Sequence, residues 1–174
     1  MNHVVLDSVG MKRTLGRLAH EILENSGGPQ DLVVIGILRK GWPVAKRLAF
    51  LMAQIEDNTI PHAKLDIAGS RDDKSSEDPD GSDIPFSVTG KRVVLVDEVI
   101  YTGRTIRAAM DAIMKFGRPA QIQLAVLIDR GHRELPIQPD FCGKHVETEP
   151  GDHIEVRLVD LDGEDAVLHL KSAE

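Results

Sequence analysis

The chain has 174 residues, enough for one domain with a sizeable core and too few for two enzyme-sized domains. Apolar residues make up 41% of it and charged residues 28%, a balance that excludes the disordered and membrane-spanning classes. The formal net charge of −7 argues against non-specific nucleic-acid binding, although the acids gather at residues 72–83 and 147–165 and leave room for a local basic face.

The cysteine count and the N-terminus bear on the cellular compartment. Cys142 is the only cysteine, which excludes an intrachain disulfide and the structural zinc sites that need several cysteines. Residues 1–13 lack the hydrophobic core of a signal peptide, and no run reaches the roughly 20 apolar residues of a membrane span. These features predict a cytoplasmic protein without a membrane partner.

The first expected element is an amphipathic helix that Asp7 or Ser8 can cap. Its apolar residues recur at helical spacing and predict one buried stripe, formed by Met11, Leu15, Leu18, Ile22 and Leu23. The opposite face is polar and favours a solvated surface; it carries Arg13, Arg17, His20 and Glu24.

A strand, a glycine-bounded loop and a helix follow. Residues 32–35 form a continuous apolar run, typical of a strand buried on both sides of a parallel sheet, and Gly36 is expected to end it. After Gly41, Pro43 suits the first turn of a helix. The buried stripe of this helix is predicted to be Val44, Leu48, Leu51, Met52 and Ile55.

A further strand is predicted at residues 61–68, and a long loop follows it. Residues 69–87 are rich in Ser, Asp, Gly and Pro and show no apolar periodicity. A loop of this length inside a compact domain indicates a flexible lid or binding loop rather than a plain connection.

The second half of the chain continues the alternation of strands and helices. Residues 93–96 and 122–128 predict interior strands, and residues 103–116 predict a helix between them. Residues 154–158 alternate as a half-exposed strand should, and residues 166–170 can pair beside it. The pattern predicts a doubly wound parallel α/β sheet that binds ligands at the carboxyl ends of its strands.

Residues 93–105 carry the clearest chemical signal: an apolar strand, two adjacent acids and a short loop that opens a helix. Free backbone N–H groups and the positive end of the helix dipole make such a loop a cradle for a monophosphate. Asp97 and Glu98 can hold ribose hydroxyls and stabilise positive charge at the anomeric carbon. The phosphate loop consists of Tyr101, Thr102, Gly103, Arg104 and Thr105.

Other catalytic and phosphate-binding motifs are absent from the sequence. A nucleoside triphosphatase would need a Gly-rich loop ending in Gly-Lys-Ser/Thr, and a dinucleotide fold would need Gly-x-Gly-x-x-Gly after a strand. The sequence shows no pattern of a Ser-His-Asp or Cys-His nucleophile. It also shows no spacing typical of metal ligands. The strand, the two acids and Thr-Gly-Arg-Thr instead resemble the motif of type I phosphoribosyltransferases that binds 5-phosphoribosyl-1-pyrophosphate (PRPP).

Further motifs narrow the resemblance to the PyrR family and extend it over nearly the whole chain. They lie at residues 17–21 (RLAHE), 36–41 (GILRKG), 71–73 (RDD), 101–105 (YTGRT), 117–119 (GRP) and 122–137 (IQLAVLIDRGHRELPI). Members of this family are uracil phosphoribosyltransferases, and many also bind the leader RNA of the pyrimidine operon when UMP is present, which promotes attenuation. The resemblance implies one phosphoribosyltransferase domain over residues 1–174, with a central, mostly parallel sheet flanked by helices, a small hood and the flexible loop near residues 69–87.

The resemblance also assigns site residues. Arg71, in the long loop, would close over PRPP and act with the catalytic Asp97 and Glu98. Mg²⁺ would enter with PRPP and be held through this substrate, without metal ligands from the protein. The base-binding segment corresponds to Ile128, Asp129 and Arg130. The pyrophosphate loop, which also suits a polyanion by its own chemistry, corresponds to Ile37, Leu38, Arg39, Lys40 and Gly41.

An RNA face and an oligomer are further implications of the resemblance. The candidate RNA-binding residues are Arg17, His20, His132, Arg133 and Lys144. In the family this face extends across a dimer, so a homodimer or a higher homo-oligomer is expected. The sequence departs from the family at Gly16, Asn25 and Gln138, where polar or basic residues are usual, and residues 145–155 are acidic. Each lost phosphate contact weakens RNA binding.

The catalytic part departs from the family as well. Glu98 stands where Asp is usual, and Gly69 and Ser70 stand where the loop usually has bulky residues, so ribose holding and loop closure are expected to be altered. Two alternatives to a uracil enzyme stay open: a non-enzymatic or weakly active RNA-binding regulator, and a phosphoribosyltransferase for a purine base.

Overall fold

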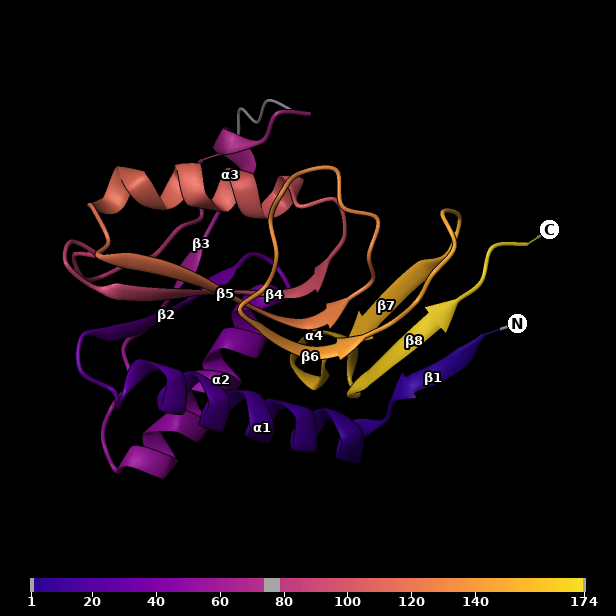
Figure 1. Cartoon of the computed structure of the whole chain (residues 1–174), viewed down its shortest axis with the longest axis horizontal. Coiled ribbons are helices and arrows are strands. Elements are labelled where there is room, and N and C mark those ends of the chain that lie inside the picture. Colours follow the sequence, from indigo (N-terminus) through magenta and orange to yellow (C-terminus); the bar gives the residue numbers. More distant parts are fainter. Residues whose placement is uncertain (1, 74–78, 174) are drawn as a thin grey trace.

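A computed structural model describes residues 2–73 and 79–173 and folds them around a central parallel sheet. Its five strands follow the order β3-β2-β4-β5-β6 (Figure 1). They are β2 (Leu32–Ile37), β3 (His62–Leu65), β4 (Arg92–Ile100), β5 (Gln121–Asp129) and β6 (Phe141–His145). Every neighbouring pair is parallel, so the carboxyl ends of the strands lie at one edge. The predicted parallel α/β sheet is confirmed.

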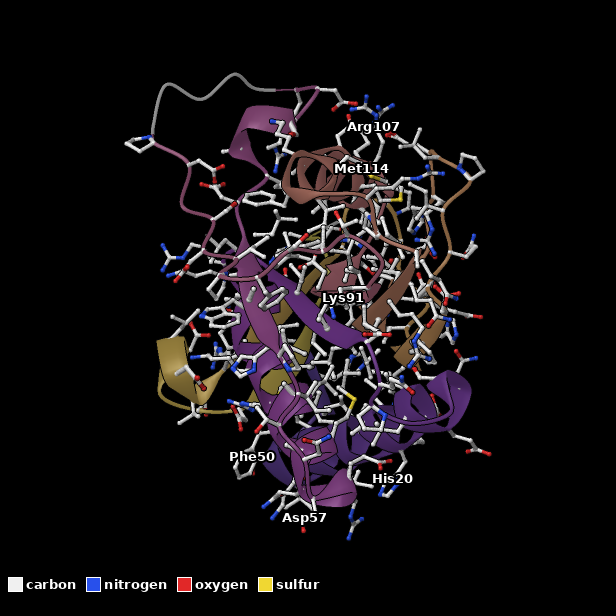
Figure 2. All side chains as sticks on the ribbon, turned by 90° about the vertical axis from the view of Figure 1, so that its left-hand side faces the viewer. His20, Phe50, Asp57, Lys91, Arg107 and Met114 are labelled. Carbon is white, nitrogen blue, oxygen red and sulfur yellow. The ribbon has the colours of Figure 1, made fainter. Side chains whose placement is uncertain are left out.

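Helices cover both faces of this sheet (Figure 1). α1 (Ser8–Ser26) and α2 (Gly41–Glu56) lie on one face, and α3 (Arg104–Ile113), continued by a short 3-10 helix (Met114–Phe116), lies on the other. Figure 2 shows the same layers from the side, with Arg107 and Met114 in the α3 layer and His20, Phe50 and Asp57 in the α1 and α2 layer. None of the helices in the described part of the chain is long and apolar enough to span a membrane.

Two apolar cores hold these layers together. α1 and α2 bury Leu18, Leu48 and Met52 against one face of the sheet, and α3 buries Ile106 against the other face. The predicted stripe of α1 is its buried face, since Met11, Leu15, Leu18, Ile22 and Leu23 are all buried. In α2 the predicted stripe is buried at Val44, Leu48 and Met52 and only partly buried at Leu51. The prediction was wrong at Ile55, which lies in the last turn and is 40% exposed.

The ends of the first elements follow local chemistry. Asp7 caps α1 as predicted, since its carboxylate accepts a hydrogen bond of 2.7 Å from the amide of Gly10. However, Gly36 does not end its strand, because β2 continues to Ile37 and α2 begins at Gly41. A Cβ atom at Gly36 would lie 2.6 Å from the Cα atom of Trp42, so this glycine permits strand and helix to pack closely.

An antiparallel sheet beside the central one forms a hood. It has the order β1-β8-β7 and consists of β1 (His3–Leu6), β7 (His153–Arg157) and β8 (Ala166–Leu170), with the short helix α4 (Val159–Asp162) between β7 and β8. The strands predicted at residues 154–158 and 166–170 are confirmed. β1 and β6 were missed because they are short and carry exposed polar residues such as His3 and Lys144.

The loop between β3 and β4 has little regular structure where it is described. The strand predicted at residues 61–68 ends at Leu65, and a short 3-10 helix (Ala68–Ser70) follows. Asp83 pairs with Lys64 in an isolated antiparallel bridge. Residues 74–78 of the predicted loop lie outside the described residues.

Candidate active site

Three loops meet at the carboxyl edge of the central sheet. β2 and β4 run in register from Leu32 opposite Arg92 to Gly36 opposite Val96, and β4 continues beside β5 as far as Ile100 opposite Asp129. The loops that follow these strands are therefore neighbours, although they are far apart in the sequence. They contain the predicted pyrophosphate, 5-phosphate and base-binding residues.

The acidic pair lies between the first two loops. Asp97 is buried, with 5% of its surface exposed, and its Oδ1 atom accepts a hydrogen bond of 2.9 Å from the amide of Glu98. Burial, and after it the neighbouring carboxylate of Glu98, raises the pKa of Asp97 well above its usual value. A ligand that brings hydroxyl groups or positive charge to this position would offset that cost.

The predicted 5-phosphate loop is a tight turn at the start of α3. Gly103 has the left-handed φ of 92°, and the hydroxyl oxygen of Thr102 accepts a bond of 3.2 Å from the amide of Arg104. The first amides of a helix have no acceptor inside the helix, so they can point at an anion. The exposed guanidinium of Arg104 lies 2.8 Å from Asp72 and 3.5 Å from Glu134.

The predicted pyrophosphate loop is packed against β4. A Cβ atom at Gly41 would lie only 2.4 Å from the carbonyl oxygen of Val96 and 3.3 Å from Oδ1 of Asp97. The loop contains a cis peptide bond between Leu38 and Arg39. The backbone of this loop therefore passes directly beside the acidic pair.

The two cations of the pyrophosphate loop have different surroundings. Arg39 is exposed at the edge of the sheet. The ammonium group of Lys40 donates to the carbonyl of Val156 in the hood and lies 3.2 Å from Asp162. Lys40 therefore joins the loop to the hood in this structure.

Arg71 lies in the long loop and is exposed. Its guanidinium makes two hydrogen bonds of 2.8 Å to the carboxylate of Asp73. The neighbouring Asp72 binds Arg104, so the described start of the long loop lies against the 5-phosphate loop. This contact puts the loop beside the site, while the side chain of Arg71 is held within its own loop.

Two of the predicted base-binding residues, Asp129 and Arg130, line a cavity of about 670 Å³ at the ends of β5 and β6. The third, Ile128, is buried in the apolar core and does not line it. Asp129 is buried and lies 2.8 Å from Arg133. Arg130 is also buried; its guanidinium lies 4.1 Å from the centre of the Tyr101 ring and donates to the carbonyl of Asp152. The Nε atom of Arg130 is buried without a hydrogen-bond partner among the described residues.

Asp152 is a residue of this region that sequence reasoning missed. Its carboxylate accepts hydrogen bonds from the amides of Glu149 and Ser172 and lies 2.7 Å from Nε2 of His169. These bonds, the one from the Glu149 amide above all, hold the pKa of Asp152 well below its usual range. In the sequence Asp152 belongs to an acidic stretch, and no local pattern separates it from the solvated acids around it.

The candidate RNA-binding residues do not form one group. Arg17, on α1, donates to the carbonyl of Gly143 in β6, next to the exposed Lys144. His20 is exposed on α1, where Figure 2 shows it in the outer helix layer. His132 lines the cavity at the ends of β5 and β6, with its Nε2 atom 2.6 Å from the carbonyl oxygen of Thr148.

Arg133 differs from these residues because it is directed into the protein. Only 12% of its side chain is exposed, and it donates to Tyr101, Asp129, Ile137 and Gln138. Its surroundings are those of a structural link between loops, in contrast to the exposed position expected of an RNA contact.

Comparison with known sequences identifies relatives over nearly the whole chain. The phosphoribosyl transferase domain family matches residues 4–160. The bifunctional protein PyrR of Pelotomaculum thermopropionicum is 53% identical over 98% of this chain and 96% of its own. The bifunctional protein PyrR of Enterococcus faecalis is 50% identical over 98% of this chain and 97% of its own.

Solved structures share the fold at much lower identity. A hypoxanthine phosphoribosyltransferase from Staphylococcus aureus has a TM-score of 0.72 at 17% identity, over 98% of this chain and 91% of that one. The hypoxanthine phosphoribosyltransferase of Trypanosoma cruzi has a TM-score of 0.74 at 16% identity, over 98% of this chain and 97% of that one. The motifs, the fold and the close relatives agree: the chain belongs to the phosphoribosyl transferase domain family and, within it, to the family of the PyrR proteins.

Proposed function

We propose that this chain is a uracil phosphoribosyltransferase, which transfers the phosphoribosyl group of PRPP to uracil and releases pyrophosphate. The observation that carries the proposal is the buried Asp97, which lies between the two loops predicted to bind phosphate groups. A ligand that matches this arrangement has a phosphate group at each end, for the two loops, and hydroxyl groups in its middle, for Asp97. PRPP has this constitution.

Each part of PRPP has a counterpart in the site. The 5-phosphate binds the amides and hydroxyls of residues 101–105, and the pyrophosphate binds the loop at residues 36–41. The ribose hydroxyls donate to Asp97 and Glu98, whose negative charge stabilises the cationic character that develops at the anomeric carbon. Uracil attacks this carbon from the side of residues 128–130, while Arg71 and its loop exclude water.

Mg²⁺ is proposed to enter with PRPP. Among residues 2–73 and 79–173, no group of three or more His, Cys, Asp or Glu side chains is arranged to hold a metal ion, and the acidic pair supplies two carboxylates. This donor set fits a cation that the substrate carries beside Asp97 and Glu98. When bound, Mg²⁺ would neutralise charge on the leaving pyrophosphate.

The choice of base is tested directly by product formation. Uracil, hypoxanthine, guanine and orotate are each supplied with PRPP and Mg²⁺, and nucleotide and pyrophosphate are measured. Uracil alone should yield a nucleotide at a rate above the background. A nucleotide formed from hypoxanthine or guanine would instead establish the purine alternative.

The acidic pair is tested by Asp97→Asn and Glu98→Gln. Each should lower turnover by about a hundredfold or more, because a neutral amide does not stabilise the developing charge. Asp97→Asn should at the same time raise the melting temperature, since it removes a buried carboxyl whose pKa is raised by burial. The pKa of Asp97 in the folded protein exceeds the unfolded value of about 3.9, so the stability of the wild type falls as the pH rises through the folded pKa. The increase in melting temperature caused by Asp97→Asn should therefore be larger at about pH 8 than at about pH 4. Wild-type turnover in both variants would refute the role of the pair.

A second function, UMP-dependent binding of a pyrimidine leader RNA, is favoured by the exposed Arg17 and Lys144 on α1 and β6. A homodimer or higher homo-oligomer would extend this face. The expected result is a UMP-dependent shift in the gel mobility of a leader RNA hairpin at moderate salt. The substitution Lys144→Gln should reduce this shift. No shift with UMP would remove this function.

A further inference from the structure

The 5-phosphate loop is held from behind by a segment that follows β5. The carbonyl oxygen of Thr102 accepts hydrogen bonds of 2.9 Å from the amide of Glu134 and 3.1 Å from the amide of Leu135. The carbonyl oxygen of Tyr101 accepts one of 2.7 Å from Nη1 of Arg133. Two successive carbonyl groups of the loop are therefore directed at residues 133–135.

These bonds determine where the loop amides point. In a trans peptide the N–H group is antiparallel to the carbonyl of the preceding residue. When the carbonyls of Tyr101 and Thr102 face residues 133–135, the N–H groups of Thr102 and Gly103 face the opposite side. That side is where a phosphate bound at the start of α3 would lie, and the carbonyl oxygens of Tyr101 and Thr102 are directed away from it.

The same segment also packs under Gly103. A Cβ atom built on this glycine would lie 3.5 Å from side-chain atoms of Arg133, Leu135 and Ile137. Gly103 is buried, so the left-handed turn rests on these side chains. The aliphatic stem of Arg133 contributes to this packing independently of its guanidinium.

All three guanidinium nitrogens of Arg133 donate hydrogen bonds. Its Nε atom donates to the carbonyl of Ile137 at 2.7 Å, and its Nη2 atom donates to Asp129 at 2.8 Å and to Gln138 at 3.0 Å. One guanidinium thus joins the end of β5 to the carbonyl of Tyr101. Lysine does not reproduce such a fork, because its single ammonium group does not reach acceptors that lie in several directions.

We propose that Arg133 is a positioning residue of the 5-phosphate site, which orients the loop amides by holding the Tyr101 carbonyl and the Asp129 carboxylate together. The proposal rests on the proposed assignment of residues 101–105 to the 5-phosphate. It gives Arg133 a role in nucleotide binding in place of a direct contact with RNA. The loss of Arg133 should therefore weaken ligands that carry the 5-phosphate and spare pyrophosphate.

The test compares Arg133→Met, which keeps an apolar stem under Gly103, with Arg133→Lys, which keeps the positive charge beside Asp129. UMP affinity is measured by calorimetry, the KM for PRPP and kcat by kinetics, and inorganic pyrophosphate is used as a competitive inhibitor. We expect Arg133→Met to weaken UMP and raise the KM for PRPP by about tenfold to a hundredfold. The inhibition constant of pyrophosphate and kcat at saturating PRPP should stay within about twofold of wild type. Arg133→Lys should weaken UMP nearly as much, because it lacks the fork.

Two control variants test whether the loss of any surface arginine weakens UMP and whether residues 101–105 bind the 5-phosphate at all. Arg157→Met removes an arginine that binds Glu155 and Glu164 on the hood, and it should leave UMP affinity unchanged. Thr105→Ala removes a hydroxyl of the phosphate loop itself; if it leaves UMP affinity unchanged, the assignment of the loop is wrong.

The proposal for Arg133 is overturned if Thr105→Ala weakens UMP while both Arg133 variants bind it as wild type does. It is also overturned if the Arg133 variants weaken UMP and pyrophosphate equally, since this would indicate general damage. If the Met variant does not fold, the same criteria apply to the Lys variant.

Discussion

The two loops that we propose as anion-binding sites, at residues 36–41 and 101–105, are built in opposite ways. The loop at residues 36–41 lies so close to β4 that a Cβ atom at Gly41 would meet the Val96 carbonyl oxygen at 2.4 Å. The loop at residues 101–105 has room for a Cβ atom at Gly103, since the nearest atoms are 3.5 Å away, but Gly103 has a left-handed φ of 92°. One glycine is required by space and the other by backbone conformation.

The loops also differ in what holds them. The first loop is fixed by its own contact with β4 and by Lys40, which binds the hood. The second is held by residues 133–137, which come from a different part of the chain. One proposed phosphate loop is thus held by close packing against its own sheet, and the other by contacts from residues 133–137. This difference predicts different responses to substitution.

The largest effect is expected from Gly41→Ala. The added methyl group would overlap the backbone carbonyl oxygen of Val96 in β4, so we expect a loss of about 3 kcal/mol or more in the free energy of unfolding. Urea unfolding measures this loss. Gly16→Ala is the matched control: nothing lies within 4 Å of its Cβ position inside α1, and it should stabilise the protein by about 0.5–1 kcal/mol. Equal stability of the two variants would mean that the close contact with β4 is not tight.

A smaller effect is expected from Gly103→Ala. The methyl group fits, and the cost is the left-handed conformation, about 1–2 kcal/mol of unfolding free energy. Relief of this strain would turn the loop amides, so UMP affinity should fall as well. Gly27→Ala, at the left-handed C-cap of α1, should lose similar stability and keep UMP affinity. A Gly103→Ala protein with wild-type UMP affinity would contradict the role of the turn in phosphate binding.

The smallest effect on stability is expected from Lys40→Met. Its ion pair with Asp162 is partly exposed and adds little, while the lost hydrogen bond to the Val156 carbonyl costs about 1 kcal/mol, so the melting temperature should fall by about 2–4 °C. The inhibition constant of pyrophosphate should nevertheless rise, because the loop loses a cation. Lys46→Met, which removes a neighbouring lysine that lies 3.8 Å from Asp160, should alter neither quantity. Unchanged pyrophosphate inhibition in Lys40→Met would show that Lys40 serves only the hood.

Local patterns were sufficient for most of the fold. β2, β4 and β5 were predicted because a strand buried on both faces is a continuous run of apolar residues. α1 was predicted because a helix buried on one face has apolar residues at helical spacing. β1 and β6 were missed because short strands with exposed polar residues show neither of these patterns. Gly36 was misread as a strand end, since a glycine that permits close packing looks the same in a sequence as one that breaks a strand.

For the proposed site, the amino-acid sequence alone predicted a contiguous set: a strand, an acidic pair and the proposed phosphate loop follow one another within residues 93–105. The end of β4 and the start of α3 bring them to the same edge of the sheet. Only the tertiary structure assigned the partners of Arg133 and Lys40. Arg133 binds the carbonyl of Tyr101, 32 residues away, and Lys40 binds that of Val156, 116 residues away. An arginine in a polar loop can reach solvent, RNA or another loop, and its sequence neighbours do not distinguish these outcomes because the deciding acceptors are brought to it only by the packing of the whole sheet.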